Sequence, residues 1–324
     1  MVTKSNIELF MDTINKANTI SICSHISPDG DAIGSSTGLY LMLKEMGKEV
    51  YLIKNDDFPS NLRFVYKEDY YTDTTPFETD LFILTDVAHH DRIGIGKEYK
   101  ELAKDSLVID HHRTEGGYCD KNLIVSSMSS TCQLITDLAL ANGLNISKET
   151  ATYLYLGMLT DTYRFQYEYS NADTLRTAAE LLDRGANKSL LHLELYESLD
   201  VDYLLLQAEV IQSAKRFKED KFIIASLTNE QLDRYGLDHD QTEGLVSIIK
   251  SIQGIELACL VKEHDVNDQK VSFRSKEEID VAELAKEFGG GGHIRASGCT
   301  LLMSNKEAFD KVYERLQRLW EESY

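Results

Sequence analysis

The sequence predicts an α/β protein with two domains, a first one built on a mainly parallel sheet flanked by helices and a smaller second one. In the first half of the chain, short apolar runs alternate with helical patterns, as in strands joined by crossover helices. A stretch rich in leucine and charged residues interrupts this alternation at residues 189–218. A length of 324 residues suits two domains. We therefore expect a first domain over residues 1–188, a helical linker over 189–218 and a second α/β domain over 219–324.

The elements of the first domain can be placed from their patterns in order along the chain. Strands are expected at residues 19–23, 49–54, 80–86 and 106–110. A capping box at Ser5 and Glu8 is expected to open a first helix. Further helices are expected over residues 37–46, 129–142, 147–161 and 171–184. In the second domain we expect a strand at 221–224, a helix over 280–287 and a last strand over 297–303.

The charge of the chain limits the partners that it can bind. Its formal net charge is -20, whereas proteins that bind long nucleic acids rely on many lysines and arginines. Long duplex nucleic acid is therefore not an expected partner. A small anionic substrate remains compatible if bound metal ions reverse the local field, although the charge alone fits a role in solubility equally well.

Hydropathy and cysteine usage predict a cytoplasmic protein that does not bind a membrane. No stretch approaches 18 consecutive apolar residues, and the N-terminus does not resemble a signal peptide. The cysteines form no C-x-x-C pair, and their odd number argues against a disulfide framework. We expect reduced thiols in the core at Cys23, Cys119, Cys132, Cys259 and Cys299.

Histidines and aspartates cluster in the first domain, mostly where expected strands end. The clusters lie at residues 25–31, 84–86, 110–112 and 159–161. Asp29 and Asp31 flank Gly30, whose backbone freedom lets both carboxylates face one point. Taken singly, the acidic turn also fits a solvated loop, Asp86 a helix cap, and the histidines a satisfied core. Together they predict a site for two divalent cations at the carboxyl ends of the strands.

These segments resemble the DHH phosphoesterase superfamily, whose naming motif stands here as Asp110-His111-His112. Residues 288–298, with four consecutive glycines before His293, resemble the glycine-rich motif of the DHHA1 domain. A glycine run is also typical of a flexible linker, but this one lies between an expected helix and the last strand. The resemblance covers almost the whole chain. It implies a DHH domain first and a DHHA1 domain second.

The resemblance implies two divalent metal ions, with Mn²⁺ as the usual metal of the family. One ion would be held by His25, Asp29 and Asp86, and the other by Asp31, Asp86, His111 and Asp161. Such a pair activates a water molecule for attack on phosphorus. Asp110 would orient the histidines, and His112 would meet the phosphate or assist the leaving group. Substrate contacts are implied, in a cleft between the domains, for Gly290, Gly291, Gly292, His293 and Arg274.

Within the superfamily, the chain is most similar to the NrnA-like nano-RNase group. This implies hydrolysis of short RNA oligonucleotides, including pApA, and removal of the 3′-phosphate from pAp, by a possible homodimer. A cyclic-dinucleotide phosphodiesterase is the alternative activity, and a pyrophosphatase is disfavoured by the glycine-rich motif. A non-catalytic nucleotide sensor would be expected to lack a ligand, yet the set is complete. Departures from the family pattern occur at Arg113, Tyr163, Arg164 and Ile294, where the arginines are either phosphate contacts or surface residues.

Overall fold

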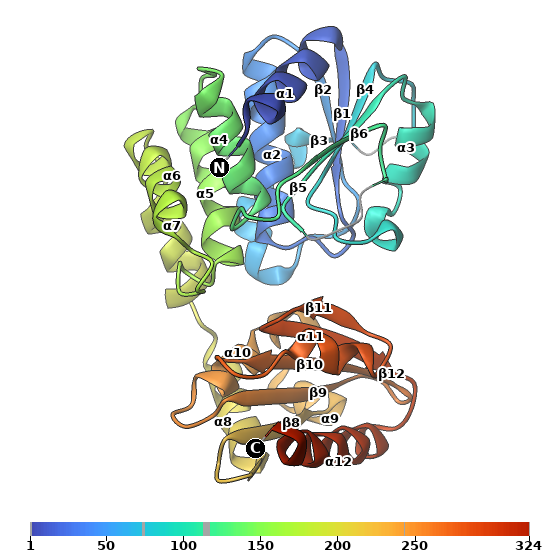
Figure 1. The fold of residues 1–324 in the computed structure, drawn as a ribbon, viewed down its shortest axis with the longest axis vertical. Helices are drawn as coiled ribbons and strands as arrows, with labels where there is room; N and C mark the ends of the chain where they lie inside the picture. The colour runs from blue at the N-terminus through green and yellow to red at the C-terminus, as the bar shows by residue number, and fades with distance from the viewer. Residues whose placement is uncertain (1, 73–74, 113–116, 243, 324) are drawn as a thin grey trace. The chain divides into compact units, whose positions relative to one another are not determined.

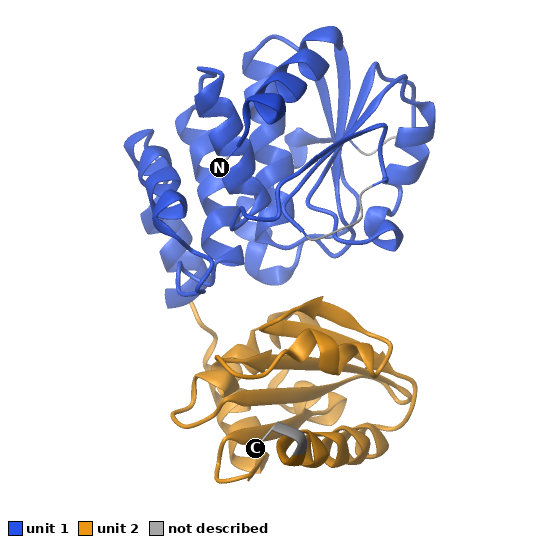
Figure 2. Ribbon diagram, viewed as in Figure 1, with its two compact units in different colours: residues 1–197 blue, residues 198–324 orange. Residues whose placement is uncertain are grey.

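A computed structural model describes residues 2–72, 75–112, 117–242 and 244–323. The chain divides into two compact units, residues 1–197 and 198–324 (Figure 2). The first unit contains a parallel sheet and the second a mixed sheet, which confirms the expected two-domain α/β class.

The parallel sheet of the first unit has the strand order β3-β2-β1-β4-β5-β6. Its strands are β1 (Thr19–Ser24), β2 (Glu49–Ile53), β3 (Tyr71–Thr72), β4 (Leu81–Thr85), β5 (Ser106–Asp110) and β6 (Lys121–Ile124). The chain first builds outward from β1 through β2 and β3, and then returns to the other side of β1 with β4. Ligands of open α/β sheets bind where the order reverses in this way, here between the carboxyl ends of β1 and β4.

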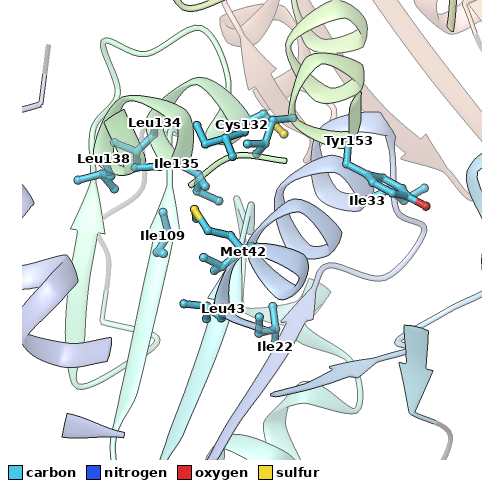
Figure 3. Packing of buried hydrophobic residues seen from close by; sticks show 14 of the residues in the cluster. Ile22, Ile33, Met42, Leu43, Ile109, Cys132, Leu134, Ile135, Leu138 and Tyr153 are labelled. Atoms are coloured by element: carbon cyan, nitrogen blue, oxygen red, sulfur yellow. The ribbon is translucent and has the colours of Figure 1, made fainter. Parts of the chain in front are cut away.

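Helices cover both faces of this sheet (Figure 1). They are α1 (Lys4–Lys16), α2 (Gly30–Glu45), α3 (Gly96–Leu102), α4 (Thr131–Ala141), α5 (Lys148–Asp161), α6 (Ala172–Asp183) and α7 (Lys188–His192), followed by the π-helical η4 (Leu193–Glu197). Strand residues alternate between two cores, because successive side chains point to opposite faces. Ile22 and Ile109 pack with Met42 of α2 and with α4 and α5 (Figure 3), whereas Cys23 packs with Tyr99 of α3.

Two details at the starts of helices differ from the expectation. The capping box of α1 is formed by Thr3 and Asn6, not by Ser5 and Glu8, because Thr3 Oγ1 accepts from the Asn6 amide and Asn6 Oδ1 from the Thr3 amide. The helix predicted to begin at residue 37 begins at Gly30 instead. Its polar first turns have no amphipathic pattern, since both sides of the helix there are buried.

The second unit is a mixed sheet with the order β11-β12-β10-β9-β8-β7. Its elements are α8 (Val201–Ser213), β7 (Lys215–Phe217), β8 (Phe222–Leu227), α9 (Asn229–Tyr235), α10 (Leu245–Ser251), β9 (Leu257–Asp265), β10 (Asp268–Ser275), α11 (Val281–Lys286), β11 (Gly291–His293), β12 (Ala296–Leu301) and α12 (Asn305–Ser323). The neighbours β8 and β9 are parallel, and the other neighbouring strands are antiparallel. Val312 of α12 packs in one core, and Leu232 of α9 and Ile249 of α10 pack in another.

The segment 189–218, expected as a linker, contributes to both units. α7 and η4 belong to the first unit, whereas α8 buries Leu206 and Val210 in a core of the second unit. The five cysteines are all buried free thiols. Among the described residues, no helix combines the length and the apolar character that a membrane span requires.

Candidate metal centre

The acidic and histidine side chains of the first unit gather at the carboxyl ends of its central strands. His25 directly follows β1, Asp86 directly follows β4, and Asp110 is the last residue of β5. Asp86 adopts a left-handed backbone with φ 58°, a conformation that aspartate tolerates better than most residues. The switch between β1 and β4 therefore brings together residues that are about sixty positions apart in sequence.

Two aspartates reach this point from the start of α2. Asp29 is the N-cap of the helix, and its Oδ1 accepts from the amides of Asp31 and Ala32 at 3.0 Å. Asp31 lies in the first turn and is 1% exposed. Its carboxylate is therefore held inside the protein, whereas the side chain of Asp29 is 58% exposed.

His25 presents one ring nitrogen to the carboxylates. Its Nδ1 lies 2.8 Å from the carbonyl oxygen of Ile26, to which a protonated Nδ1 donates. Its Nε2 lies 3.7 Å from Asp29 Oδ2 and 3.7 Å from Asp86 Oδ2. With the proton on Nδ1, the lone pair of Nε2 faces the two carboxylates, as a metal-binding histidine requires. Arg92 donates to Ile26 O at 3.0 Å, and its Nη2 also lies 2.8 Å from His25 Nδ1. Because a guanidinium can only donate, Nδ1 has two competing partners, and the tautomer with the proton on Nδ1 pairs it with Ile26 O.

His111 is arranged in the same way on the other side of Asp86. Its Nδ1 lies 3.3 Å from the carbonyl oxygen of Met128. Its Nε2 lies 3.3 Å from Asp161 Oδ2, 3.8 Å from Asp86 Oδ1 and 3.9 Å from Asp31 Oδ2. Asp161 is the last residue of α5. Asp86 thus directs one oxygen toward His25 and the other toward His111.

His112 is bound to Asp110 instead of pointing its Nδ1 to a backbone carbonyl. Its Nδ1 lies 2.8 Å from Asp110 Oδ1, which also accepts from the His112 amide at 3.1 Å. Burial disfavours the protonated ring, but the hydrogen bond to Asp110 and the charge of Asp86 raise the pKa of His112 to about 10. His112 is therefore a cation at neutral pH.

These donor sets fit divalent cations. In each of three groups the ligand atoms lie within 4.8 Å of one another: His25, Asp29 and Asp86; Asp31, His111 and Asp161; and Asp86, His111 and His112. Atoms that share an ion at about 2.1 Å are roughly 3 to 4 Å apart, as they are here. His111 Nε2 and Asp161 Oδ2 are buried without a hydrogen-bond partner among the described residues. A cation would satisfy both atoms.

Without a metal, the carboxylates of this centre resist ionisation. Burial raises the pKa of Asp31 to about 7, and the charge of Asp161 adds to the effect. Burial and the charge of Asp31 raise the pKa of Asp86 to about 7 as well. Burial also raises the pKa of Asp161. A concentration of negative charge in a dry site is costly, so the centre needs positive charge at neutral pH.

The metal-free protein is expected to lose stability as the pH rises. The folded-state pKa values of Asp31 and Asp86 are raised, so protonation of these two carboxyl groups stabilises the folded state. This contribution is complete below about pH 4 and is lost as the pH rises through about 7. We expect the unfolding midpoint of the first unit to fall by about 5 °C between pH 5 and pH 8. Scanning calorimetry with EDTA measures this fall. Saturating Mn²⁺ should abolish it, and an equal fall with and without Mn²⁺ would contradict the explanation.

The amino end of α4 supports the centre, a role that the sequence analysis missed. The amides of Thr131 and Cys132 donate to Asp31 Oδ2 and Oδ1 at 2.7 and 2.9 Å. Thr131 Oγ1 donates to Asp86 Oδ1 at 2.9 Å. A helix amino end favours a negative charge, so these amides partly offset the effect of burial on the pKa of Asp31, which is nevertheless raised to about 7. The only signal in the sequence is the polar run before the helix, which does not reveal a contact made 100 positions away.

Replacing Thr131 with valine removes this hydroxyl while preserving the shape of the side chain. Residues that orient metal ligands commonly contribute about 10- to 100-fold to metal affinity, and we expect a loss in that range for Thr131→Val. Thr131→Ser keeps the hydroxyl and should retain the affinity. Calorimetric titration of Mn²⁺ into the metal-free proteins measures the difference. Equal affinities for the valine and serine variants would contradict the role.

The residues expected to contact substrate lie in the second unit, where β12 brings two of them near each other. Arg274 of β10 pairs with Ala296, and His293 of β11 pairs with the same alanine. Directly opposed residues of antiparallel strands project to the same face. Arg274 and His293 therefore lie on one side of the sheet, two strands apart. The Arg274 guanidinium donates to the carbonyl oxygen of Phe273 at 2.9 Å.

The glycines before His293 have different structural roles. A side chain at Gly290 would place its Cβ 2.1 Å from the carbonyl oxygen of Gly298, so glycine is required for β12 to approach. Gly292 has φ 142°, which disfavours any side chain. Gly291 is exposed, and a Cβ there would meet nothing within 4 Å. Gly291 therefore leaves backbone accessible to a ligand without being needed for packing.

This contrast gives a matched pair of substitutions. Gly291→Ala should leave the unfolding midpoint within about 2 °C of the wild type but raise KM for a short nucleotide about tenfold, because the methyl group occupies the space of the substrate. Gly290→Ala should destabilise the second unit by about 2 kcal/mol through the clash with β12. Thermal unfolding and steady-state kinetics distinguish the two. An unchanged KM in Gly291→Ala would exclude close contact with substrate at this glycine.

Of the departures from the family pattern, Arg113 lies outside the described residues. Ile294 is 46% exposed. Tyr163 and Arg164 lie in the segment that follows Asp161 in sequence, where the guanidinium of Arg164 packs on the rings of Tyr163 and Tyr196. The structure therefore brings the six expected ligands together, with Asp110 and His112 beside them.

The fold and the centre define an α/β protein with a parallel-sheet domain carrying an acidic, histidine-containing metal site. Comparison with known families agrees. The family described as "DHH family, N-terminal domain" matches residues 19–158, and the "DHHA1 domain" matches residues 219–322.

Named relatives extend the match over nearly the whole chain. The bifunctional oligoribonuclease and PAP phosphatase NrnA of Thermus thermophilus is 31% identical over 306 residues, covering 92% of this chain and 89% of the relative. The NrnA of Bacillus subtilis is 31% identical over 314 residues, covering 96% and 97%. The crystal structure of an exopolyphosphatase-related protein from Bacteroides fragilis has a TM-score of 0.89 at 30% identity, covering 99% and 100%. The chain belongs to the DHH family, with a DHHA1 domain in its second half.

Proposed function

We propose that this protein is a manganese-dependent phosphoesterase that hydrolyses short RNA oligonucleotides to nucleoside monophosphates and pAp to AMP. The observation that carries the proposal is the position of Asp86, whose two oxygens face His25 and His111 at 3.7 and 3.8 Å. The chain is also similar over most of its length to proteins named as bifunctional oligoribonucleases and PAP phosphatases. Both reactions break a phosphate ester. One site that binds phosphate and activates water serves both.

The proposed ligands divide into two sets around Asp86. His25, Asp29 and Asp86 would hold one divalent ion, and Asp31, Asp86, His111 and Asp161 the other. When bound, the ions would supply a nucleophile derived from water at neutral pH and neutralise charge on the phosphate oxygens. A mixed set of imidazole and carboxylate ligands suits Mn²⁺. The backbone carbonyls of Ile26 and Met128 lie beside Nδ1 of His25 and His111, and the amino end of α4 positions the carboxylates of Asp31 and Asp86.

His112 is the proposed proton donor of the reaction. Its raised pKa, about 10, keeps it protonated over the physiological range. A cationic imidazole can donate a hydrogen bond to a phosphate oxygen or a proton to the leaving oxygen of the ester. Asp110, which binds Nδ1 at 2.8 Å, would orient the ring and stabilise its charge. The leaving group would therefore depart as a neutral hydroxyl.

The second unit would supply the groups that select a small substrate. We propose that Arg274 and His293 bind substrate phosphate beside the segment Gly290, Gly291 and Gly292. The Gly290 amide donates to the carbonyl oxygen of Ala285 at 2.9 Å, so Gly290 would shape this segment and not bind phosphate through its amide. The net charge of -20 disfavours long nucleic acids, which gain affinity from many basic contacts. A cytoplasmic location agrees with RNA substrates and free buried cysteines. The homodimer stays a prediction.

The number and identity of the metals can be tested directly. Native mass spectrometry of the metal-free protein titrated with Mn²⁺ should show two bound ions, and Asp86→Asn should bind at most one. Turnover of pApA and of pAp should return with Mn²⁺ more fully than with Mg²⁺ or Zn²⁺. A single ion at saturation would contradict the proposed two-ion site. Equal turnover in the presence of EDTA would contradict metal dependence itself.

A further inference from the structure

The segment that follows Asp161 has an unusual backbone. Tyr163, Arg164 and Phe165 have φ values of 48°, 63° and 63°, so three consecutive side-chain-bearing residues are left-handed. Each costs roughly 1 to 2 kcal/mol relative to an ordinary conformation. Strain of this kind persists only where the surrounding structure imposes it, and it concentrates at ligand-binding sites. The proposed ion centre does not by itself require a bulky residue at position 163.

This backbone aligns a row of aromatic rings next to the metal centre. We name Tyr163, Tyr167 and Tyr169 the tyrosine row. The rings of Tyr163 and Tyr167 are stacked, with centroids 5.6 Å apart and planes at 23°, and those of Tyr167 and Tyr169 are 5.4 Å apart. Tyr169 is 49% exposed, and the other two are partly buried. The Tyr169 hydroxyl donates to the main-chain carbonyl oxygen of Asp161 at 2.8 Å, so the row is attached to the backbone of the residue whose carboxylate is a proposed metal ligand.

Arg164 packs against the ring of Tyr163 instead of extending toward solvent. Its guanidinium carbon lies 5.0 Å from the ring centre of Tyr163 and 4.7 Å from that of Tyr196, within the range of cation–π attraction. Its Nε is buried without a hydrogen-bond partner among the described residues. A cation in this position fixes the rings before any ligand arrives. Binding to a preformed surface avoids the entropic cost of ordering it.

We propose that the tyrosine row is a binding site for a nucleobase of the substrate, adjacent to the phosphate that is cleaved. This inference rests on the proposed function, because it requires a nucleotide at the metal centre. Proteins recognise single-stranded RNA largely by stacking its bases on aromatic side chains. Stacking tolerates every base, since each has a π face, and is worth about 1 to 3 kcal/mol per base. A base held there orients the ester that joins it to the next nucleotide.

The position of the row also gives a reason for a preference for short substrates. The row consists of three rings in a segment that follows a proposed metal ligand, so it can stack few bases. A short oligonucleotide gains its full stacking energy there, whereas additional nucleotides of a longer strand gain nothing from it. In a protein of net charge -20, those additional phosphates are instead repelled. The tyrosine row would therefore bind a substrate through its bases. Nucleases that act on longer strands instead bind the phosphates in basic grooves.

Four variants test the base-binding role. Tyr163→Phe keeps the ring, Tyr163→Ala removes it, and Tyr163→Gly removes it and also relieves the left-handed strain. Tyr169→Leu removes a half-exposed ring outside the strained segment and serves if a variant at position 163 fails to fold. The probe is the ribonucleoside monophosphate of aminopurine, a fluorescent analogue of the AMP product, titrated in the presence of Mg²⁺. Stacking on tyrosine quenches its fluorescence.

We expect the wild type and Tyr163→Phe to quench the fluorescence. Tyr163→Ala and Tyr163→Gly should not quench it and should bind the probe about 5- to 150-fold more weakly. For an RNA dinucleotide, KM should rise similarly with little change in kcat, while an abasic dinucleotide should be cleaved equally by all variants. Equal quenching and affinity in wild type and Tyr163→Ala would overturn the inference. It would also be overturned if Tyr163→Ala lost binding and Tyr163→Gly restored it, because backbone strain would then be the cause. If the wild type quenches but cleaves no RNA, the proposed function fails and the base site stands.

Discussion

Asp86→Asn is expected to lower kcat/KM for a short oligoribonucleotide by at least about 10³-fold, or roughly 4 kcal/mol of transition-state stabilisation. The reason is that both oxygens of Asp86 are used, with one facing His25 at 3.7 Å and the other facing His111 at 3.8 Å. Asparagine tolerates the left-handed backbone at this position, so the change removes charge and one ligand oxygen without adding strain. Steady-state kinetics after metal stripping and Mn²⁺ repletion measure the loss.

Asp91→Asn is the matched control for this substitution. Asp91 lies five residues away, and its side chain is 81% exposed. We expect its activity to remain within about twofold of the wild type, because the exposed carboxylate faces solvent. The metal-free Asp86→Asn protein should also unfold at a higher temperature than the metal-free wild type at pH 8, since it lacks a buried charge. Substantial activity in a folded, Mn²⁺-loaded Asp86→Asn protein would exclude the shared-ligand role.

Gly157→Ala is expected to damage the metal centre, although Gly157 lies in the middle of α5 and is not itself a ligand. A Cβ at residue 157 would lie 2.2 Å from Cys132 Sγ and 2.6 Å from Asp31 Oδ1. α5 must therefore approach α2 and α4 without a side chain, and the methyl group would displace Asp31. We expect about 3 kcal/mol of destabilisation, a midpoint lower by about 6 to 12 °C, and at least tenfold weaker Mn²⁺ binding.

Gly38→Ala provides the comparison on the same helix pair. The nearest atoms to a Cβ there are Cδ2 and Cγ of the buried Leu154, at 2.9 Å, so this side chain must shift, but no proposed metal ligand is in the way. Alanine favours the helix by about 1 kcal/mol, so Gly38→Ala should destabilise less than Gly157→Ala and should leave the Mn²⁺ affinity unchanged. Calorimetry gives the unfolding midpoints, and titration of Mn²⁺ gives the affinities. Normal Mn²⁺ affinity in Gly157→Ala would show that Asp31 is not held by this packing.

The fold class was predictable because strands buried on both faces appear as apolar runs between helical patterns. The grouping of the expected ligands was predictable, because several of them follow parallel strands whose carboxyl ends meet at one edge of the sheet. Their binding of metal stays a prediction. The start of α2 was not predictable from periodicity, since a helix buried on several sides loses the amphipathic signal. Asp29 and Asp31, expected in a loop, are instead fixed by helical geometry, which makes the site more rigid than the sequence suggested.

The supporting residues of the centre were missed because their contacts are long-range. Thr131 lies 45 positions from Asp86, and only the folded chain shows that its hydroxyl reaches that carboxylate. The tyrosine row was missed for a different reason, since its spacings of four and two positions at Tyr163, Tyr167 and Tyr169 do not follow one helical or strand period. Their alignment comes from left-handed backbone that local propensity disfavours. Sequence patterns thus identify chemical groups more readily than the packing that orients them.

The central claim is that the metal centre hydrolyses very short RNA. The measurement that tests it most directly is Mn²⁺-dependent release of mononucleotides from an RNA ladder of about two to about twenty nucleotides, with EDTA and Asp110→Ala as controls. We expect turnover to be fastest for the shortest RNAs, to fall steeply with length, and to be lost in both controls. Equal turnover at all lengths, or no metal-dependent turnover of any of them by the folded wild type, would contradict it.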